Sequence, residues 1–351
     1  MRSSLLVVGA AATVLVLSSC SPSTQDEIAD ASAATPPITA QAQDAPSVVV
    51  TTTVLGSVVG EILTCAVGDE SSMTVLMPLG ADPHDFQASS AQVALMASAD
   101  LVVANGLGLE EGVMDALDNV EADGVPVLEI AALVDPLPFG EEYEEEHSGQ
   151  ESHDDHGHGE EEEHSGQESH DDHGHGEFDP HFWFDMERMA IAAELIGAEL
   201  TVKGEESFAS CGESVAEEIR AAEALVADTL SSVQEANRVL VTDHDALGYL
   251  AEGYDFDIVG VVIPGGSTLG DANSSDLADL VATIQNEGVR AIFGNTAGSP
   301  ALLQTLAAEV GGDVRVVELF VGSLGGPGSG AESYQEMMTT NATRIASALA
   351  D

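Results

Sequence analysis

Basic residues are scarce in this chain. It has 351 residues, with 8 Lys and Arg against 62 Asp and Glu, which gives a formal net charge of −54. Binding to nucleic acid needs clustered Lys and Arg to neutralise phosphates, so this composition excludes a nucleic-acid-binding protein. The acidity runs through the whole sequence, which favours solubility outside the cell or adaptation to salt over a binding role for most of it. Some of it should still raise the local concentration of cations.

The chain begins without an apolar run long enough to span a membrane. Residues 5–17 are mostly apolar, and thirteen residues cannot cross a hydrocarbon layer of ~30 Å as a helix. This run, preceded by a positive charge, instead predicts an export signal over residues 1–19. The sequence just before Cys20 resembles a bacterial lipobox, which implies cleavage there and lipidation of the thiol. The alternative is an ordinary secretory signal with an incidental cysteine. Residues 20–46, small, polar and interrupted by prolines, are expected to form a flexible tether behind the lipid.

Cysteine is also rare, with three residues in the chain. With Cys20 assigned to the lipid, only Cys65 and Cys211 remain. An exported pair meets an oxidising compartment, so a disulfide between them is expected. Two isolated buried thiols are the alternative, because the sequence does not show whether the two Cα atoms come within reach.

Short apolar runs alternate with helical stretches along most of the chain. This alternation predicts parallel βαβ units. The predicted strands are 48–53, 74–77, 101–104, 125–130, 239–241, 258–263, 291–293 and 314–319. The predicted helices are 54–65, 91–97 (capped by Ser89 or Ser90), 110–117, 246–254, 275–287, 300–310 and 333–350.

The length after the tether, about 300 residues, is more than one hydrophobic core usually supports. We therefore expect an α/β fold of two lobes built from parallel-sheet βαβ units, at residues 47–180 and 237–351. A long helical segment over residues 181–236 is predicted to bridge the lobes, with a break or bend near Gly204 and near Cys211-Gly212.

An acidic, histidine-rich tract over residues 141–177 interrupts the first lobe. It is an internal duplication, since the sequence of residues 145–160 recurs over residues 162–177. With almost no apolar residues it cannot offset chain entropy, so we predict a disordered loop when metal is absent. Its composition favours auxiliary metal binding, while a purely solvated loop is the alternative. The histidines concerned are His147, His153, His156, His158, His164, His170, His173 and His175.

Three further histidines lie outside the tract. His84 and His181 each follow Asp-Pro, and His244 stands between two aspartates. Proline fixes its own φ and keeps the preceding residue out of the helical region, so each Asp-Pro-His forms a stiff turn. Neutral imidazole is a common Zn²⁺ ligand, and adjacent acids can accept the second ring N–H. The sequence therefore predicts a three-histidine metal site drawn from three separate segments.

Five ordered segments carry a family resemblance. They are residues 79–84, 99–110, 179–185, 244–250 and 333–338. Together they resemble the zinc/manganese solute-binding proteins of metal ABC transporters, and the similarity spans about residues 48–351. The histidine-rich insertion just before the second ligand turn is part of this likeness.

The resemblance implies a metal held in a cleft between two α/β lobes bridged by one long helix. It implies His84, His181 and His244 as ligands, and the third histidine points to Zn²⁺ rather than Mn²⁺ because nitrogen-rich sites favour zinc. Many relatives have aspartate where this chain has Gly322, and a carboxylate where it has Asn295. We expect water as the fourth donor. The carboxylates that are alternative donors, or partners of the histidines, are Asp82, Asp179, Asp245 and Asp271.

The function expected from the resemblance is that of a lipid-anchored receptor, a monomer on the outer face of the bacterial cytoplasmic membrane. It would capture Zn²⁺ and pass it to the permease of an ABC transporter. A surface adhesin and a metal store acting through the tract are the alternatives from another class. A His₃-zinc hydrolase is the enzymatic alternative. We expect no enzyme, because the chain has no HExxH helix, no GxSxG elbow and no evident general base.

Overall fold

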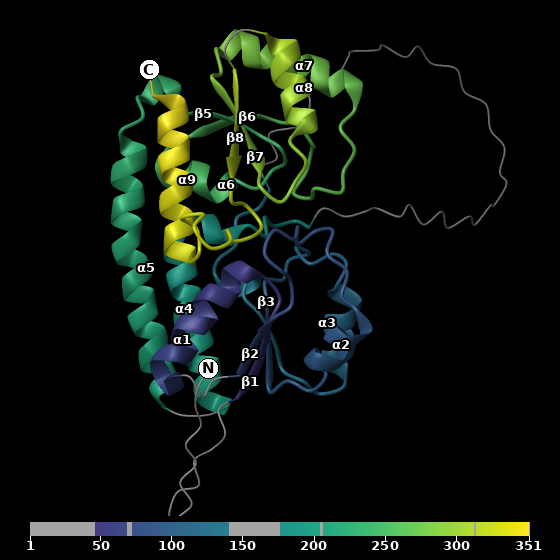
Figure 1. The fold of residues 1–351 in the computed structure, drawn as a ribbon, viewed down its shortest axis with the longest axis vertical. Coiled ribbons are helices and arrows are strands. Elements are labelled where there is room, and N and C mark those ends of the chain that lie inside the picture. Colours follow the sequence, from purple (N-terminus) through teal and green to yellow (C-terminus); the bar gives the residue numbers. More distant parts are fainter. Residues whose placement is uncertain (1–45, 69–71, 140–175, 204–205, 312–313, 351) are drawn as a thin grey trace, which may run out of the picture. The chain divides into compact units, whose positions relative to one another are not determined.

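Two four-stranded parallel sheets organise the chain (Figure 1). The computed structural model describes residues 46–68, 72–139, 176–203, 206–311 and 314–350. The first sheet has the order β2 (Ser72–Val75), β1 (Ser47–Val50), β3 (Leu101–Ala104), β4 (Val127–Glu129). The second has the order β6 (Asp257–Val261), β5 (Val239–Thr242), β7 (Ala291–Asn295), β8 (Arg315–Leu319). The predicted fold of two parallel-sheet α/β lobes is confirmed.

The central strands are buried on both faces, which explains their continuous apolar runs. In β1, Val48 and Val50 point into one hydrophobic core, and Val49 points into another. In the second sheet, Phe293 faces the first of these cores, while Ile292 faces a third. This two-residue alternation places each sheet between two layers of helices.

Nine α-helices cover the two sheets in the described part of the chain. They are α1 (Thr53–Val67), α2 (Ser90–Met96), α3 (Met114–Ala122), α4 (Met186–Lys203), α5 (Ser207–Ser231), α6 (Gly248–Tyr254), α7 (Ser274–Glu287), α8 (Ala301–Val310) and α9 (Tyr334–Leu349). Helices α1, α4, α5 and α9 lie together along one side, where they share a single core with residues of both sheets (Figure 1). Helices α2 and α3 cover the other face of the first sheet, and α7 and α8 cover the other face of the second. None of the described helices is long and apolar enough to span a membrane.

Several bounds differ from the sequence-based expectation by a few residues, and two differences are larger. The predicted bend at Cys211-Gly212 is absent, because α5 runs unbroken through both residues. The predicted helix at 110–117 begins only at Met114. Residues 110–113 instead form hydrogen-bonded turns, and the buried carboxylate of Glu110 accepts the backbone N–H groups of Asn105 and Gly106 at 2.7 and 3.1 Å, which fixes the loop just before them.

Helices α4 and α5 approach each other closely at a pair of glycines. A Cβ added to Gly212 would lie 2.6 Å from the carbonyl oxygen of Ala193 and 3.0 Å from the Cα of Gly197. Next to this seam, Cys211 forms a disulfide with Cys65 of α1, with the two Cα atoms 5.8 Å apart. Small residues and the disulfide therefore fix the helical layer that both lobes share.

The substitution Gly212→Ala should destabilise the protein although alanine favours helices. The added methyl group would overpack the contact between α4 and α5, which costs about 1–3 kcal/mol of stability. The higher helix propensity of alanine returns only up to about 1 kcal/mol. Thermal or urea unfolding measures the difference. Gly253→Ala in α6 is the matched control, since its added Cβ would have no neighbour within 4 Å and should stabilise or leave stability unchanged. Equal effects of the two substitutions would contradict the close packing.

Candidate metal centre

The three histidines predicted from the sequence as metal ligands lie in segments that connect the strands and helices. His84 lies in the loop after β2, and His244 comes two residues after β5 ends. His181 precedes the short 3₁₀ helix η4 (Phe182–Phe184). In open α/β folds, ligands bind outside the carboxyl ends of the parallel strands. The topology therefore delivers three distant segments to one place.

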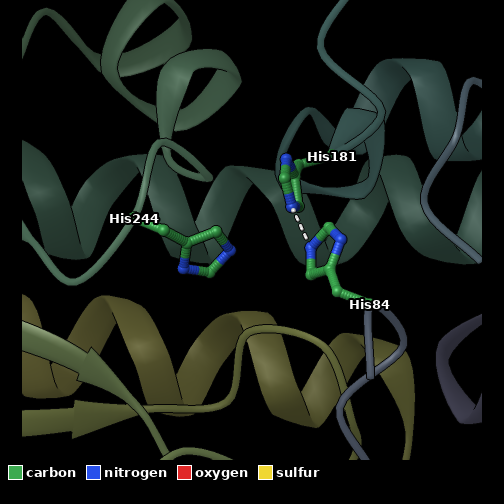
Figure 2. Close-up of side chains that lie close together, drawn as sticks. All are labelled: His84, His181 and His244. Atoms are coloured by element: carbon green, nitrogen blue, oxygen red, sulfur yellow. Dashed lines mark hydrogen bonds between the residues drawn. The ribbon is translucent and has the colours of Figure 1, made fainter. Parts of the chain in front are cut away.

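The three imidazoles face one another in the structure (Figure 2). Each offers a ring nitrogen, and these three atoms all lie within 4.8 Å of one another. The Nε2 atoms of His84 and His181 are 3.4 Å apart, and the three pairs of ring centroids are separated by 5.3–5.6 Å. All three side chains are buried, with exposed fractions of 1–3%. Buried nitrogens converging in this way form a geometry that can hold one divalent ion.

The His181 ring is fixed by the aspartate of its own turn. Oδ1 of Asp179 lies 2.7 Å from His181 Nδ1 and also accepts the His181 backbone N–H at 2.9 Å. The Asn105 side chain donates to the carbonyl of Pro180 at 2.9 Å, and the Tyr249 hydroxyl donates to that of Asp179 at 2.9 Å. With Nδ1 bound to the carboxylate, Nε2 is left to face the centre of the site.

Burial also sets the ionisation of this pair. It raises the pKa of Asp179 to about 7, although hydrogen bonding from the His181 backbone and the nearby histidines act in the opposite direction. Burial lowers the pKa of His181 well below its usual value, and the neighbouring His244 and His84 reinforce the shift. His181 is therefore held neutral, the form in which imidazole binds a metal.

His244 has a similar support. Oδ1 of Asp243 lies 3.0 Å from His244 Nδ1, and Oδ2 accepts the backbone N–H of Asn295 at 2.8 Å. Burial is the largest single influence on both partners and acts against their charged forms. Their mutual hydrogen bond and charge attraction, together with further backbone N–H groups at Asp243 and other nearby aspartates at His244, outweigh burial, so the pKa of Asp243 is lowered and that of His244 is raised. The partner of this ring is thus Asp243, whereas Asp245 was the neighbour named from the sequence.

His84 is supported differently. Oδ1 of Asp82 accepts the His84 backbone N–H at 3.1 Å, and Oδ2 accepts the Thr268 hydroxyl at 2.7 Å. The nearest ion-pairing carboxylate to the His84 ring belongs to Glu111, with Oε1 3.6 Å from Nδ1. His84 and Glu111 also form part of the wall of a cavity of about 830 Å³, lined by residues of both lobes.

The candidate fourth donors lie outside this cluster. Among the described residues, no carboxylate joins the three histidine nitrogens within the 4.8 Å limit. Asp271 is exposed, and Asp245 lines a separate cavity with Asp179. A Cβ at Gly322 would lie 2.5 Å from Cδ of Pro83, so an aspartate at this position would require the His84 turn to move. The Oδ1 atom of Asn295 accepts the backbone N–H of Ala297 at 3.0 Å.

Several polar residues of the site, among them Asp243, Glu111 and Tyr249, were not named as site residues from the sequence. Glu111 gave no signal of its own, because it is one acid among many. Tyr249 lay inside a family motif, but its hydrogen bond to the second ligand turn depends on the tertiary fold. The tract histidines and Cys20 lie outside the described residues.

The tract is inserted directly beside the site. Pro138 and Phe178 form an isolated antiparallel bridge, and the Phe139 N–H donates to the Glu177 carbonyl at 3.2 Å. The described residues on either side of the tract are therefore paired with each other just before Asp179.

Comparison with known proteins agrees with this architecture. The model of the zinc-uptake complex component A periplasmic (ZnuA) family matches residues 48–348. The manganese-binding lipoprotein MntA of Halalkalibacterium halodurans is 25% identical, over 84% of this chain and 86% of that protein. The zinc-binding protein TroA of Treponema pallidum is 26% identical, over 88% of this chain and 91% of its own. A solved structure of periplasmic TroA superposes with a TM-score of 0.70 at 25% identity, covering 87% of this chain and 99% of that one.

These matches confirm the family expected from the sequence motifs, and they exclude the enzymatic alternative, because the members of this family are not enzymes. The chain belongs to the ZnuA family of metal-binding solute-binding proteins, which work with ABC transporters.

Proposed function

We propose that this protein captures Zn²⁺ with His84, His181 and His244 and delivers it to the permease of an ABC transporter. The observation that carries the proposal is the convergence of three buried imidazole nitrogens within 4.8 Å of one another. Three histidines leave one tetrahedral position of zinc open. We assign that position to water, since the described carboxylates lie outside the cluster.

Zinc is preferred over manganese because of the donor set. Imidazole suits zinc, whereas carboxylate, carbonyl and water oxygens suit manganese. The relatives include both a manganese-binding and a zinc-binding protein, so family membership alone does not choose the ion. The three nitrogen donors of this chain favour Zn²⁺.

We further propose that the protein acts as a monomer outside the cytoplasmic membrane, held there by a lipid on Cys20. The lipobox-like sequence supports the anchor, and the name of the MntA relative includes the word lipoprotein. One acyl chain alone binds membranes weakly, so several chains on Cys20 would be needed for stable attachment.

Deleting residues 141–175 separates the site from the histidine-rich tract. The hydrogen bond between Phe139 and Glu177 shows that the chain can be rejoined here. The deletion leaves Gly140 and Gly176 as a two-residue loop, and glycine suits the positive φ angles that tight hairpins require.

We expect the shortened protein to bind one equivalent of Zn²⁺, and the full chain to bind further, weaker equivalents. Trp183 should report the single site, because its ring lies 5.2 Å from that of His181. Calorimetry gives the stoichiometry and tryptophan emission the occupancy. A metal store would instead lose most of its capacity on deletion, with no response of Trp183 at one equivalent.

A further inference from the structure

The three candidate ligands differ in what faces their second ring nitrogen. His181 and His244 have an aspartate oxygen 2.7 and 3.0 Å from Nδ1, each supplied by their own segment. The aspartate of the His84 turn, Asp82, binds backbone and hydroxyl groups instead. Nδ1 of His84 is buried and has no hydrogen-bond partner among the described protein atoms. Glu111 is the carboxylate that stands 3.6 Å from it.

Glu111 and Asp82 are tied to two consecutive hydroxyl residues of the second lobe. The Ser267 hydroxyl donates to Oε1 of Glu111 at 2.5 Å, and the Thr268 hydroxyl donates to Oδ2 of Asp82 at 2.7 Å. Ser267 and Thr268 belong to the loop between β6 and α7, whereas both carboxylates belong to the first lobe. One short loop segment thus binds both Asp82, in the His84 turn, and Glu111, beside the His84 ring.

We propose that Glu111 is the positioning residue for His84, and that Ser267 and Thr268 form a hydroxyl latch that holds the His84 turn and Glu111 in place. This inference rests on the proposed function. When Nε2 of His84 binds the ion, Nδ1 must carry the proton, and a metal-bound imidazole usually donates that proton to a carboxylate or carbonyl. Glu111 is in place to accept it after an approach of less than 1 Å. The Glu111 oxygen that faces His84 also accepts a hydrogen bond from the Ser267 hydroxyl. Metal binding by His84 in the first lobe is therefore coupled to the contact between the first lobe and the second.

The test uses the full chain in chelator-buffered Zn²⁺, with Trp183 emission as the readout of this site. Glu111→Ala should weaken zinc affinity by about 10–100-fold, the usual cost of losing a group that orients a metal-bound histidine. Glu177→Ala is the matched control. It removes the same charge from the wall of the same cavity, and it should leave the affinity unchanged.

Ser267→Ala should speed zinc release about tenfold, as measured by stopped flow against excess chelator, because a hydrogen bond to a charged group is lost. If the serine acts through Glu111, the double variant Glu111→Ala/Ser267→Ala should release zinc no faster than Glu111→Ala alone. Glu111→Gln keeps an acceptor oxygen and should recover part of the affinity. Fully additive effects in the double variant would overturn the latch.

Nitrogen-15 NMR of the histidine rings detects the hydrogen bond of His84 Nδ1 directly, and a general loss of stability would not remove that signal from the folded protein. The zinc-loaded wild type and Glu177→Ala should show a hydrogen-bonded Nδ1 proton on His84, and Glu111→Ala should lose it. If Glu111→Ala matches Glu177→Ala in affinity and spectrum while Trp183 still responds to zinc, the role of Glu111 is overturned and the proposed function stands. A wild-type chain whose Trp183 does not respond to zinc would overturn both.

Discussion

Replacing His181 with alanine is expected to lower the Zn²⁺ affinity by at least about 100-fold, since even groups that only orient metal ligands are worth 10–100-fold. The His181 ring is held on both of its nitrogen sides. Asp179 holds its Nδ1, and its Nε2 lies 3.4 Å from that of His84. The remaining two imidazoles would leave two positions of a tetrahedral ion to water. Competition with a zinc chelator, read by calorimetry, measures the change.

His147→Ala is the matched control for this loss. It removes one imidazole from the tract, so it should lower the number of weak equivalents and leave the tight one unchanged. The melting temperature of metal-free His181→Ala should also be compared with that of the wild type, to separate a lost ligand from a damaged fold. Unchanged tight binding in a folded His181→Ala protein would rule out the three-histidine site.

The architecture could be predicted well from the sequence because the patterns that distinguish helices from strands, a 3.6-residue period and short apolar runs, are local. Apolar runs such as residues 101–104 are strands buried on both sides, and both bounds of that strand were predicted correctly. The prediction was wrong at residues 110–113, which have a helical pattern but form turns. Beside them the Glu110 carboxylate binds backbone N–H groups five and four residues earlier, a contact that the helical pattern does not predict.

At the metal site, too, local contacts could be predicted from the sequence and contacts between distant segments could not. Two identical Asp-Pro-His turns suggested one arrangement for both histidines. In the structure Asp179 binds the ring of its histidine, whereas Asp82 binds the hydroxyl of Thr268, far away in the sequence. The first contact is local and can be guessed from spacing. The second depends on how the β6–α7 loop packs against the first lobe, and spacing carries no information about that packing.

The second large effect concerns stability. Removing the disulfide with Cys65→Ala/Cys211→Ala is expected to lower the free energy of unfolding by about 4–5 kcal/mol, because the bond closes a loop of 146 residues in the unfolded chain. This is a large fraction of the 5–15 kcal/mol typical of a folded protein. Alanine is preferred to serine because Cys211 is 5% exposed, and a hydroxyl there would be buried. Urea unfolding of the metal-free protein, with and without a reductant for the wild type, measures the loss.

The tract gives this prediction an internal control. Deleting residues 141–175 shortens the sequence separation of the two cysteines from 146 to 111 (146 less the 35 removed). Loop-closure entropy depends on the logarithm of length, so the disulfide should stabilise the shortened protein by only a few tenths of a kcal/mol less. The disulfide joins α1 to α5, and neither cysteine belongs to the histidine cluster, so the folded double variant should keep its zinc affinity. A disulfide whose removal costs less than about 1 kcal/mol in both backgrounds would mean that the reduced, unfolded chain already retains structure that keeps the two cysteines close, so that loop entropy contributes little here.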